Sequence, residues 1–322
     1  MLRFILMRLG KAAIILIAIL TLNFFLIHAA PGDPAAVMAG EAGAADAKFI
    51  AQLREQFGLD KPLLVQLGIY LKGVIQLDLG YSYRQQMPVA DLIFQRLPAT
   101  LLLTVSAFII SLFLGTLAGV LASARVGKWS DTLISSLALL FYATPLFWAA
   151  LMAVLLFSVY LNWLPGFGYE TVGANYTGFA RALDIGKHLI LPAATLGLFF
   201  MAVYMRMTRA SMLEVSQLDF VKTARAKGLK PSIIQRRHIF RNAMLPVVTL
   251  AGLQAGQLVG GAVLTETVFA WPGIGRLMFE ALAQRDYNLL LGVFFVSAAM
   301  VLLFNLVTDI LYRVVDPRIR VA

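Results

Sequence analysis

The chain has 322 residues, of which 60% are hydrophobic and only 14% are charged, and its mean hydropathy is +0.81. These values exclude a soluble globule of this size, which needs more charge on its surface, and they predict a membrane protein. The formal net charge is +10. Because no nucleic-acid-binding motif accompanies this charge, we attribute it to membrane topology rather than to nucleic-acid binding. Cysteine is absent and the three histidines lie far apart, so we predict no metal site.

Six apolar windows are long enough to span a bilayer, because a hydrocarbon core about 30 Å thick needs about 20 residues of helix. They are Leu9–Ile27, Leu101–Ala122, Leu133–Leu161, Leu189–Met205, Pro246–Leu264 and Leu289–Tyr312. The sequence therefore predicts an all-α polytopic membrane protein with six transmembrane helices. Arg3, Arg8 and Lys11 lie before or at the start of the first window, as basic residues do in a signal peptide, but the length of the window favours a span that is retained.

The distribution of basic residues predicts how these helices are oriented. With the amino terminus in the cytoplasm, the inside segments carry 17 of the 27 Lys and Arg residues and 5 of the 17 Asp and Glu residues. Cytoplasmic loops are enriched in Lys and Arg, so we expect both termini in the cytoplasm. The segment from Arg206 to Arg241 contributes most, with nine basic residues and two acidic ones. We expect it to be a cytoplasmic loop.

The windows divide the chain into three parts. We predict an N-terminal transmembrane helix over 1–29, an external segment over 30–98, and a five-helix core over 99–322 with a cytoplasmic loop at 206–245 and an external loop at 265–288.

The external segment carries a helical pattern although it is not an apolar span. Phe49, Ile50, Leu53 and Phe57 recur at helical spacing, Gly58 suits a helix stop, and Pro62 suits the start of a second helix. We expect amphipathic helices on the outer face. They either pack on the protein's own spans or form a docking surface for an external partner.

The third window contains a proline in its middle. Pro145 removes a backbone donor, and a membrane helix tolerates such a loss where neighbouring groups satisfy the freed carbonyl. The sequence predicts a kinked helix at this position.

The fifth window carries two different stripes. Gly252, Gly256 and Gly260 lie on one face at glycine-x-x-x-glycine spacing, which predicts close helix packing. Gln254 and Gln257 lie on another face. Amides are costly in lipid without partners, so these two are candidates for a translocation pathway, with a hydrogen bond between helices as the alternative.

The sixth window has polar residues near its end. Asn305 and Asp309 are four residues apart, and Arg313 follows four residues later on the same face. This spacing predicts a structural ion pair near the inner end of the helix. A role in lining the pathway is the alternative for Asn305 and Asp309.

The sequence lacks the motifs of an enzyme or of a self-powered pump. It has no phosphate-binding loop ending in Gly-Lys-Ser/Thr, no serine elbow and no His-Glu-x-x-His pair. Ionisable residues are nearly absent from the middle of the windows, where a proton-driven carrier needs them. We therefore predict a transport subunit without catalytic residues, which receives energy from a partner.

Several segments carry a family resemblance. They are Met207–Glu214, Asp219–Leu229, Arg237-His238, Arg241–Pro246, Gly58–Leu63, Leu97–Thr100, Thr265–Gly275, Arg285–Tyr287 and Asp316–Arg320. In this order, and over essentially the whole chain, they resemble the permease subunits of bacterial binding-protein-dependent ABC importers of the dipeptide, oligopeptide and nickel type. The resemblance implies the type I ABC importer permease fold and the bacterial inner membrane.

The resemblance also implies a short coupling helix that docks in a cleft of a cytoplasmic ATPase. The residues carried over are Asp219, Phe220, Lys222, Thr223, Ala224, Arg225, Ala226, Lys227, Gly228 and Leu229. The family pattern is Glu-Ala-Ala-x-x-x-Gly, and here Lys222 stands in place of the glutamate. Gly228 suits a left-handed helix end, and Asp219 is favourably placed for the helix dipole.

The external loop next to the fifth window contains Glu266 and the sequence Trp-Pro-Gly from Trp271. By resemblance this loop lies near the outer mouth of the pore. Glu266 is either structural or a contact for the cationic end of a peptide.

The resemblance implies a complex with a second, homologous permease, two cytoplasmic ATPases and a periplasmic or lipid-anchored solute-binding protein. ATP and Mg²⁺ would bind to the ATPases, and this chain itself would hold no cofactor. Peptides are the expected solutes, with nickel chelates, glutathione or another small solute as alternatives. The alternatives from other classes are a stand-alone channel or secondary carrier, which would move solute without an ATPase, and a membrane-embedded hydrolase.

Overall fold

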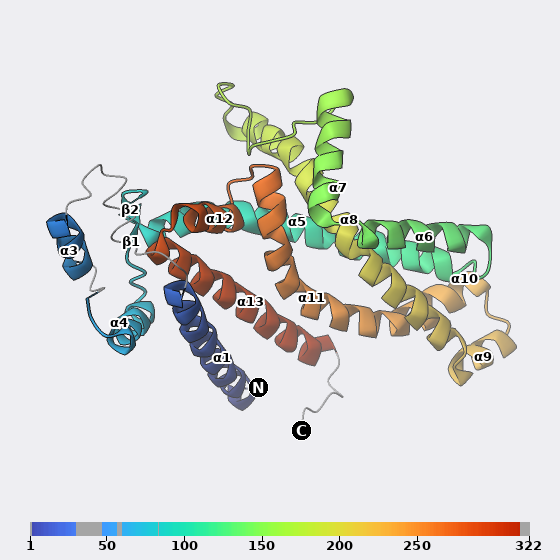
Figure 1. The fold of residues 1–322 in the computed structure, drawn as a ribbon. Helices are drawn as coiled ribbons and strands as arrows, with labels where there is room; N and C mark the ends of the chain where they lie inside the picture. The colour runs from blue at the N-terminus through green and yellow to red at the C-terminus, as the bar shows by residue number, and fades with distance from the viewer. Residues whose placement is uncertain (1, 30–46, 57–59, 83, 316–322) are drawn as a thin grey trace. The chain divides into compact units, whose positions relative to one another are not determined.

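The computed structural model describes residues 2–29, 47–56, 60–82 and 84–315, and these residues are almost entirely helical (Figure 1). They divide into two compact units. Unit 1 comprises Met1–Pro98 and Gly273–Leu302, and unit 2 comprises Ala99–Pro272 and Leu303–Ala322. The predicted residues Phe57 and Gly58 and the segment Asp316–Arg320 lie outside the described residues.

Unit 1 contains the first helices of the chain and part of the last. Its helices are α1 (Leu2–Ala29), α3 (Ala47–Gln56), α4 (Leu63–Ile75), the start of α5 (Val89–Ser123), α12 (Ile274–Gln284) and the first part of α13 (Tyr287–Val315). A short antiparallel hairpin pairs β1 (Tyr81–Ser82) with β2 (Met87–Pro88). The two helices expected between residues 49 and 75 are present as α3 and α4, and Pro62 occupies the position just before α4.

Capping by Asp286 fixes the start of α13. Its Oδ1 accepts a hydrogen bond from the backbone N–H of Leu289 at 3.1 Å, which satisfies a free donor of the first helical turn. Its Oδ2 accepts a short hydrogen bond from the hydroxyl of Ser82 in β1. A single buried carboxylate therefore ties the hairpin to the start of α13.

Unit 2 contains the remaining helices. They are the rest of α5, α6 (Trp129–Ala143), α7 (Leu146–Ala153), the π-helix η1 (Val154–Tyr160), α8 (Gly178–Ser216), α9 (Asp219–Ala226), α10 (Pro231–Ile233), the π-helix η2 (Ile234–Phe240), α11 (Arg241–Val268) and the end of α13. The long helix α8 packs against α6, α7 and α11.

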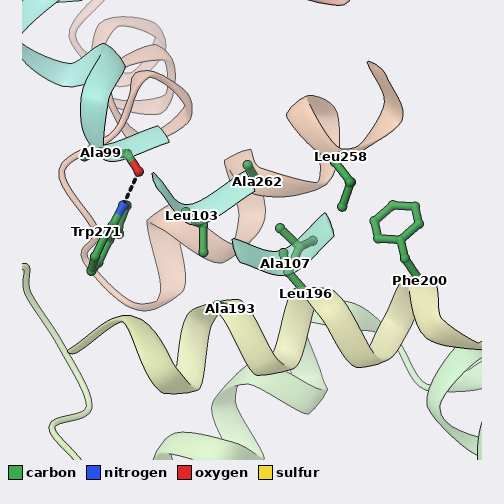
Figure 2. Packing of buried hydrophobic residues seen from close by; sticks show 9 residues of the cluster. All are labelled: Ala99, Leu103, Ala107, Ala193, Leu196, Phe200, Leu258, Ala262 and Trp271. Carbon is green, nitrogen blue, oxygen red and sulfur yellow. Dashed lines mark hydrogen bonds between the residues drawn. The ribbon is translucent and has the colours of Figure 1, made fainter. Parts of the chain in front are cut away.

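A compact apolar core joins three helices of unit 2 (Figure 2). It is formed by Ala99, Leu103 and Ala107 of α5, Ala193, Leu196 and Phe200 of α8, Leu258 and Ala262 of α11, and Trp271. The many alanines let the helix backbones approach closely, as they do in other membrane helix bundles. Farther along, Gly115 and Gly119 of α5 face α8 so closely that a Cβ atom at either position would lie 2.6 Å from an α8 atom.

Four described helices are individually long and apolar enough to cross a membrane: Leu6–Ala29, Val89–Ser123, Gly178–Ser216 and Tyr287–Thr308. Two bent pairs raise the number to six if each pair is one span, in agreement with the six predicted windows. These pairs are Trp129–Ala143 with Leu146–Tyr160, and Pro231–Leu258 with Ala262–Val268.

The prediction of a single kinked helix at Pro145 is wrong. The axes of Trp129–Ala143 and Leu146–Tyr160 differ by 102°, so the third window forms two separate helices. Proline disfavours the helical conformation of the preceding residue, and Thr144 is accordingly extended, with φ −78° and ψ 129°. Pro145 itself has ψ 128°. Because both residues are extended, the helix is interrupted and the chain changes direction. A kinked helix would instead continue through the proline with one hydrogen bond lost.

Candidate functional site

The basic loop of unit 2 contains a separate two-turn helix, α9, which follows the end of α8 (Figure 1). Leu218 precedes it in an extended conformation, and Asp219 starts the first turn, where a negative charge stabilises the helix dipole. The carboxylate of Asp219 pairs with the Lys222 ammonium group at 2.8 Å, and both side chains are exposed. The predicted coupling helix is therefore present as a discrete element.

One face of α9 anchors the helix to the rest of unit 2. Val221 and Ala224 are buried against Met212 of α8 and Ile234 and Ile239 of η2. At about 100° per residue these two side chains share one face, and Asp219, Thr223 and Ala226 lie on the opposite one. All three of the latter are exposed. The helix thus presents one free face of small and charged residues.

The end of α9 is a Schellman motif. The N–H of Gly228 donates to the carbonyl of Arg225 at 2.9 Å, and the N–H of Leu229 donates to the carbonyl of Ala224 at 3.4 Å. These two bonds require a left-handed residue after the helix, and Gly228 has φ +72°. The predicted left-handed glycine is confirmed.

The structure divides the ten predicted coupling residues into three groups. Those with surface available to a partner on the free face and end of α9 are Asp219, Phe220, Lys222, Thr223, Ala226, Lys227 and Gly228. Ala224 is only 5% exposed, so it positions the helix and cannot present a contact to an ATPase in this conformation. Arg225 and Leu229 are exposed toward a cavity behind the helix. Which of the ten residues contact an ATPase stays a prediction.

An ion pair that sequence analysis missed fixes the chain next to this loop. Arg209 of α8 donates two hydrogen bonds of 2.8 Å to the carboxylate of Asp131 at the start of α6. Asp131 is 5% exposed and also accepts a bond from the N–H of Gly127 at 3.1 Å. The sequence offers one signal for this pair, because the two opposite charges lie near the predicted inner ends of neighbouring spans. The two residues are 78 positions apart, so the sequence alone does not show that they pair.

The glycine stripe of α11 meets different surroundings at each step. A Cβ atom on Gly252 would lie 1.8 Å from the Thr308 methyl group of α13, so only glycine fits there. Gly256 is buried. Gly260 is exposed, and no heavy atom of the described chain lies within 4 Å of a Cβ built on it. Close helix packing at Gly260 stays a prediction.

The polar pathway candidates of the fifth and sixth windows lie on α11 and α13. Gln254 is half-buried, and its Oε1 has no hydrogen-bond partner among the described residues. Gln257 is exposed on the same helix, and Asn305 is half-buried on α13, one turn before Thr308. The side chains of Asp309 and Arg313 lie outside the described part of the chain. A role of these residues in a pathway stays a prediction.

Glu266 has a structural environment in this conformation. It has no exposed surface, and its Oε1 accepts a hydrogen bond of 2.6 Å from the hydroxyl of Thr100 in α5. The neighbouring Trp271 is also fully buried, and its indole N–H donates to the carbonyl of Ala99 at 2.8 Å (Figure 2). The geometry therefore favours the structural alternative for Glu266 over contact with a peptide.

The nearby connection between η1 and α8 is folded onto the same end of unit 2. The N–H and hydroxyl of Thr171 donate to the Asp184 carboxylate at 2.6 and 2.8 Å. The N–H of Gly168 donates to the carbonyl of Phe269 at 2.9 Å, and the ring of Tyr169 meets Trp271 edge to face. This end of the unit is therefore held by contacts within the chain.

Two family models together match almost the whole chain. The model described as "Binding-protein-dependent transport system inner membrane component" matches residues 111–321. The model for the N-terminal part of such membrane components matches residues 1–104. The matched regions include α9, the ion pair and the end of α11.

Similar proteins of known name span the same length. The chain is 43% identical to the dipeptide transport system permease protein DppB of Escherichia coli K12, over 99% of both chains. It is 40% identical to the protein of the same name from Alkalihalophilus pseudofirmus, over 95% of this chain and 96% of the other. It is 39% identical to a putative peptide transport system permease protein of Brucella abortus, over 98% of both.

Solved structures share the fold at low sequence identity. A chain of the inward-facing MetNI methionine ABC transporter matches with a TM-score of 0.57 and 19% identity, over 70% of this chain and 96% of that one. A chain of an amino acid ABC transporter crystallised with histidines matches with a TM-score of 0.51 and 17% identity, over 69% and 94%. The arrangement of the helices is therefore that of an ABC transporter permease.

Proposed function

Because the chain belongs to the family of inner-membrane components of binding-protein-dependent transport systems, we propose that it forms, with a second permease, the pathway through which an ATP-driven importer takes up peptides. It is a multi-pass membrane transport subunit with the fold of ABC transporter permeases. The observation that carries the proposal furthest is α9, a discrete helix with one anchored face and one free face. An amphipathic helix with an exposed face at the end of a helix bundle offers an ATPase a surface to bind.

The proposed complex contains four kinds of component. A second, homologous permease completes the pathway, two ATPase subunits bind ATP and Mg²⁺, and a periplasmic or lipid-anchored protein delivers the solute. This chain contributes no catalytic group and no cofactor site to that cycle. It would reside in the bacterial inner membrane with both termini and α9 in the cytoplasm, as the distribution of its basic residues favours.

The geometry suggests how movement of the ATPases would reach the membrane helices. Closure of the ATPases on ATP would displace α9, which is anchored to α8 and η2 through Val221 and Ala224. The Arg209–Asp131 pair would carry the displacement of α8 to α6, because paired groups on rigid helices move together. The pathway would change from inward-facing to outward-facing in this step, and hydrolysis of ATP would reset it.

Peptides are the proposed solute because the named relatives at 39–43% identity are dipeptide or peptide permeases. Nickel chelates, glutathione and other small solutes are the alternatives, since the same architecture would serve them. The solute-binding protein, rather than this chain, would supply most of the selectivity.

Copurification tests the composition of the proposed complex. The tagged chain is extracted in mild detergent, and every protein that copurifies is identified by mass spectrometry. We expect a second permease and nucleotide-binding subunits. A partner-free protein that mediates solute flux in liposomes without ATP would contradict the proposal and favour a channel or secondary carrier.

Peptide uptake tests the proposed solute. The assembled complex is reconstituted in liposomes with its binding protein outside and ATP inside, and uptake of a labelled dipeptide is measured. We expect uptake that needs both ATP and the binding protein, and a control without Mg²⁺ should show none. Uptake of a nickel chelate or glutathione, with no dipeptide uptake, would assign the same architecture to the alternative solute.

A further inference from the structure

A cavity of about 610 Å³ lies behind α9, between the ends of α5 and α8 and the η2 segment. Its volume is within the range of binding sites for small ligands. Met212, Ile234 and Ile239 are among its apolar lining residues, and Arg225, Gln235 and Ser216 are among the polar ones. None of the described residues that line it is acidic. The lining would therefore suit a ligand that combines a negative charge with an apolar part.

The polar groups of the cavity are available to a ligand. Neither the guanidinium of Arg225 nor the side-chain amide of Gln235 has a hydrogen bond or ion pair within the part of the chain that the structure describes. By contrast, Lys222 on the free side of the same helix is paired with Asp219. The guanidinium of Arg225 can donate two parallel hydrogen bonds to a phosphate, and the amide of Gln235 can donate another.

Arg225 lies apart from the free face of α9. At about 100° per residue it flanks the buried pair Val221 and Ala224, whereas Thr223 and Ala226 point to the other side. A partner that grips the free face therefore leaves the cavity side of the helix unoccupied. The cavity is a separate site behind the proposed docking surface.

The cavity lies at the ends of two helices that are long and apolar enough to cross a membrane. Its wall includes Ser123 at the end of α5 and Ser216 at the end of α8, where both membrane helices stop. The adjoining turn between α5 and α6 exposes Arg125 and Lys128. Basic pockets at the cytoplasmic ends of membrane helices are suited to anionic lipid headgroups.

We propose that this cavity binds an anionic phospholipid of the inner leaflet, with its phosphate on Arg225 and Gln235 and the start of its acyl chains along Met212, Ile234 and Ile239. The bound lipid supports the inner flank of α9 while the free face engages its partner. This inference rests on the proposed function only for the placement of the loop at the inner membrane surface.

Native mass spectrometry of the purified full-length chain tests the proposal. The chain is extracted from membranes that contain equal amounts of phosphatidylglycerol and phosphatidylcholine, and the lipids that it retains are counted. We expect the wild-type chain to retain phosphatidylglycerol preferentially. Arg225→Gln should lower that preference by about fivefold, which is the effect expected of one basic residue at an anionic membrane surface.

Two further variants separate this site from general charge effects. Arg236→Gln removes an exposed cation of the same loop that does not line the cavity, and it should leave the preference unchanged. Ser216→Phe fills the cavity without changing the charge, and it should lower lipid retention as Arg225→Gln does. Equal retention by the wild-type, Arg225→Gln and Ser216→Phe chains would overturn the proposal.

Competition experiments and addition of the ATPase subunits test whether something other than a lipid occupies the cavity. Displacement of the lipid by inorganic phosphate at low concentration would show that a soluble phosphate is the ligand and would overturn the lipid assignment. Loss of the lipid on addition of the ATPases would show that an acidic segment of the partner fills the cavity, and would also overturn it. A chain that retains the lipid but does not assemble or transport would count against the proposed function alone.

Discussion

The two ends of unit 2 are held together in different ways. At one end, Trp271 and Glu266 have no exposed surface and hydrogen-bond to Ala99 and Thr100 at the start of the unit's α5 segment. At the other end, α9 buries only Val221 and Ala224 and exposes the rest of its residues. The Trp271 end is completed by the chain itself, whereas the α9 end offers a surface to another molecule.

This contrast predicts different consequences for mutations at the two ends. Substitutions at the Trp271 end should lower the stability of the isolated chain, because they remove internal packing and hydrogen bonds. Substitutions on the free face of α9 should leave stability nearly unchanged and alter the response to partners.

Trp271→Ala should have the largest effect. It removes a fully buried indole and its hydrogen bond to Ala99, and truncations of this kind cost about 3–5 kcal/mol. We expect a lower midpoint of thermal unfolding for the chain in detergent. Trp163→Ala is the matched control because Trp163 is 69% exposed, and it should change the midpoint little. Equal effects of the two substitutions would contradict the role assigned to Trp271.

Alanine substitutions at Gly252 and Gly260 test which part of α11 packs against the chain itself. Gly252→Ala should lower the free energy of unfolding by about 1–3 kcal/mol, because the new methyl group meets Thr308. Gly260→Ala has open space in the described chain, so we expect no loss of stability. If Gly260 packs against the second permease, its substitution should instead reduce recovery of that partner on copurification. Normal recovery with Gly260→Ala would remove this position from the subunit interface.

Substitution of the Asp131–Arg209 pair tests whether this ion pair links α8 to α6 near α9. Side-chain exposure is 6% for Asp131 and 30% for Arg209, so water screens the pair only in part. In a double-mutant cycle with Asp131→Asn and Arg209→Gln, we expect a coupling energy of about 1–3 kcal/mol in unfolding. The single variants should also hydrolyse ATP without proportional uptake of solute in the assembled complex. Additive effects on both measurements would show that the pair does not link α8 to α6.

Much of the fold could be predicted because it depends on local patterns. The six apolar windows correspond to four long helices and two bent pairs, since window length alone determines which segments can cross a bilayer. The coupling helix was located through a family resemblance. The position where this helix ends could be predicted from Gly228 alone, because glycine readily adopts the left-handed conformation that is found there.

The remaining features depend on contacts between distant residues. The hydrogen bond between Thr100 and Glu266 joins positions 166 residues apart, so the sequence left open whether Glu266 is buried or lines a pathway. The right-angle turn at Pro145 depends on Thr144 and Pro145 being extended together, whereas a proline motif alone also fits a kink. The burial of Ala224 required the positions of Met212, Ile234 and Ile239.

Gly228 gives the smallest expected change in stability and the sharpest test of the α9 end. Open space surrounds this residue, so a side chain adds no clash, and only the left-handed backbone opposes it. Gly228→Ala should cost about 1–2 kcal/mol through that strain. Gly228→Asn should cost less, because asparagine tolerates the left-handed conformation.

Solute-stimulated ATP hydrolysis by the assembled complex is the decisive measurement for these variants. We expect Gly228→Leu to abolish stimulation, Gly228→Ala to reduce it and Gly228→Asn to retain most of it, with normal membrane insertion in all three. Backbone strain ranks asparagine above alanine, because a displaced end of α9 misplaces the free face that a partner would contact. Leucine adds a bulky side chain at this exposed end of the helix, where a partner would meet it. Normal stimulation in Gly228→Leu would show that the conformation of α9 does not control the ATPases, and the contrast between the two ends would then lose its functional meaning.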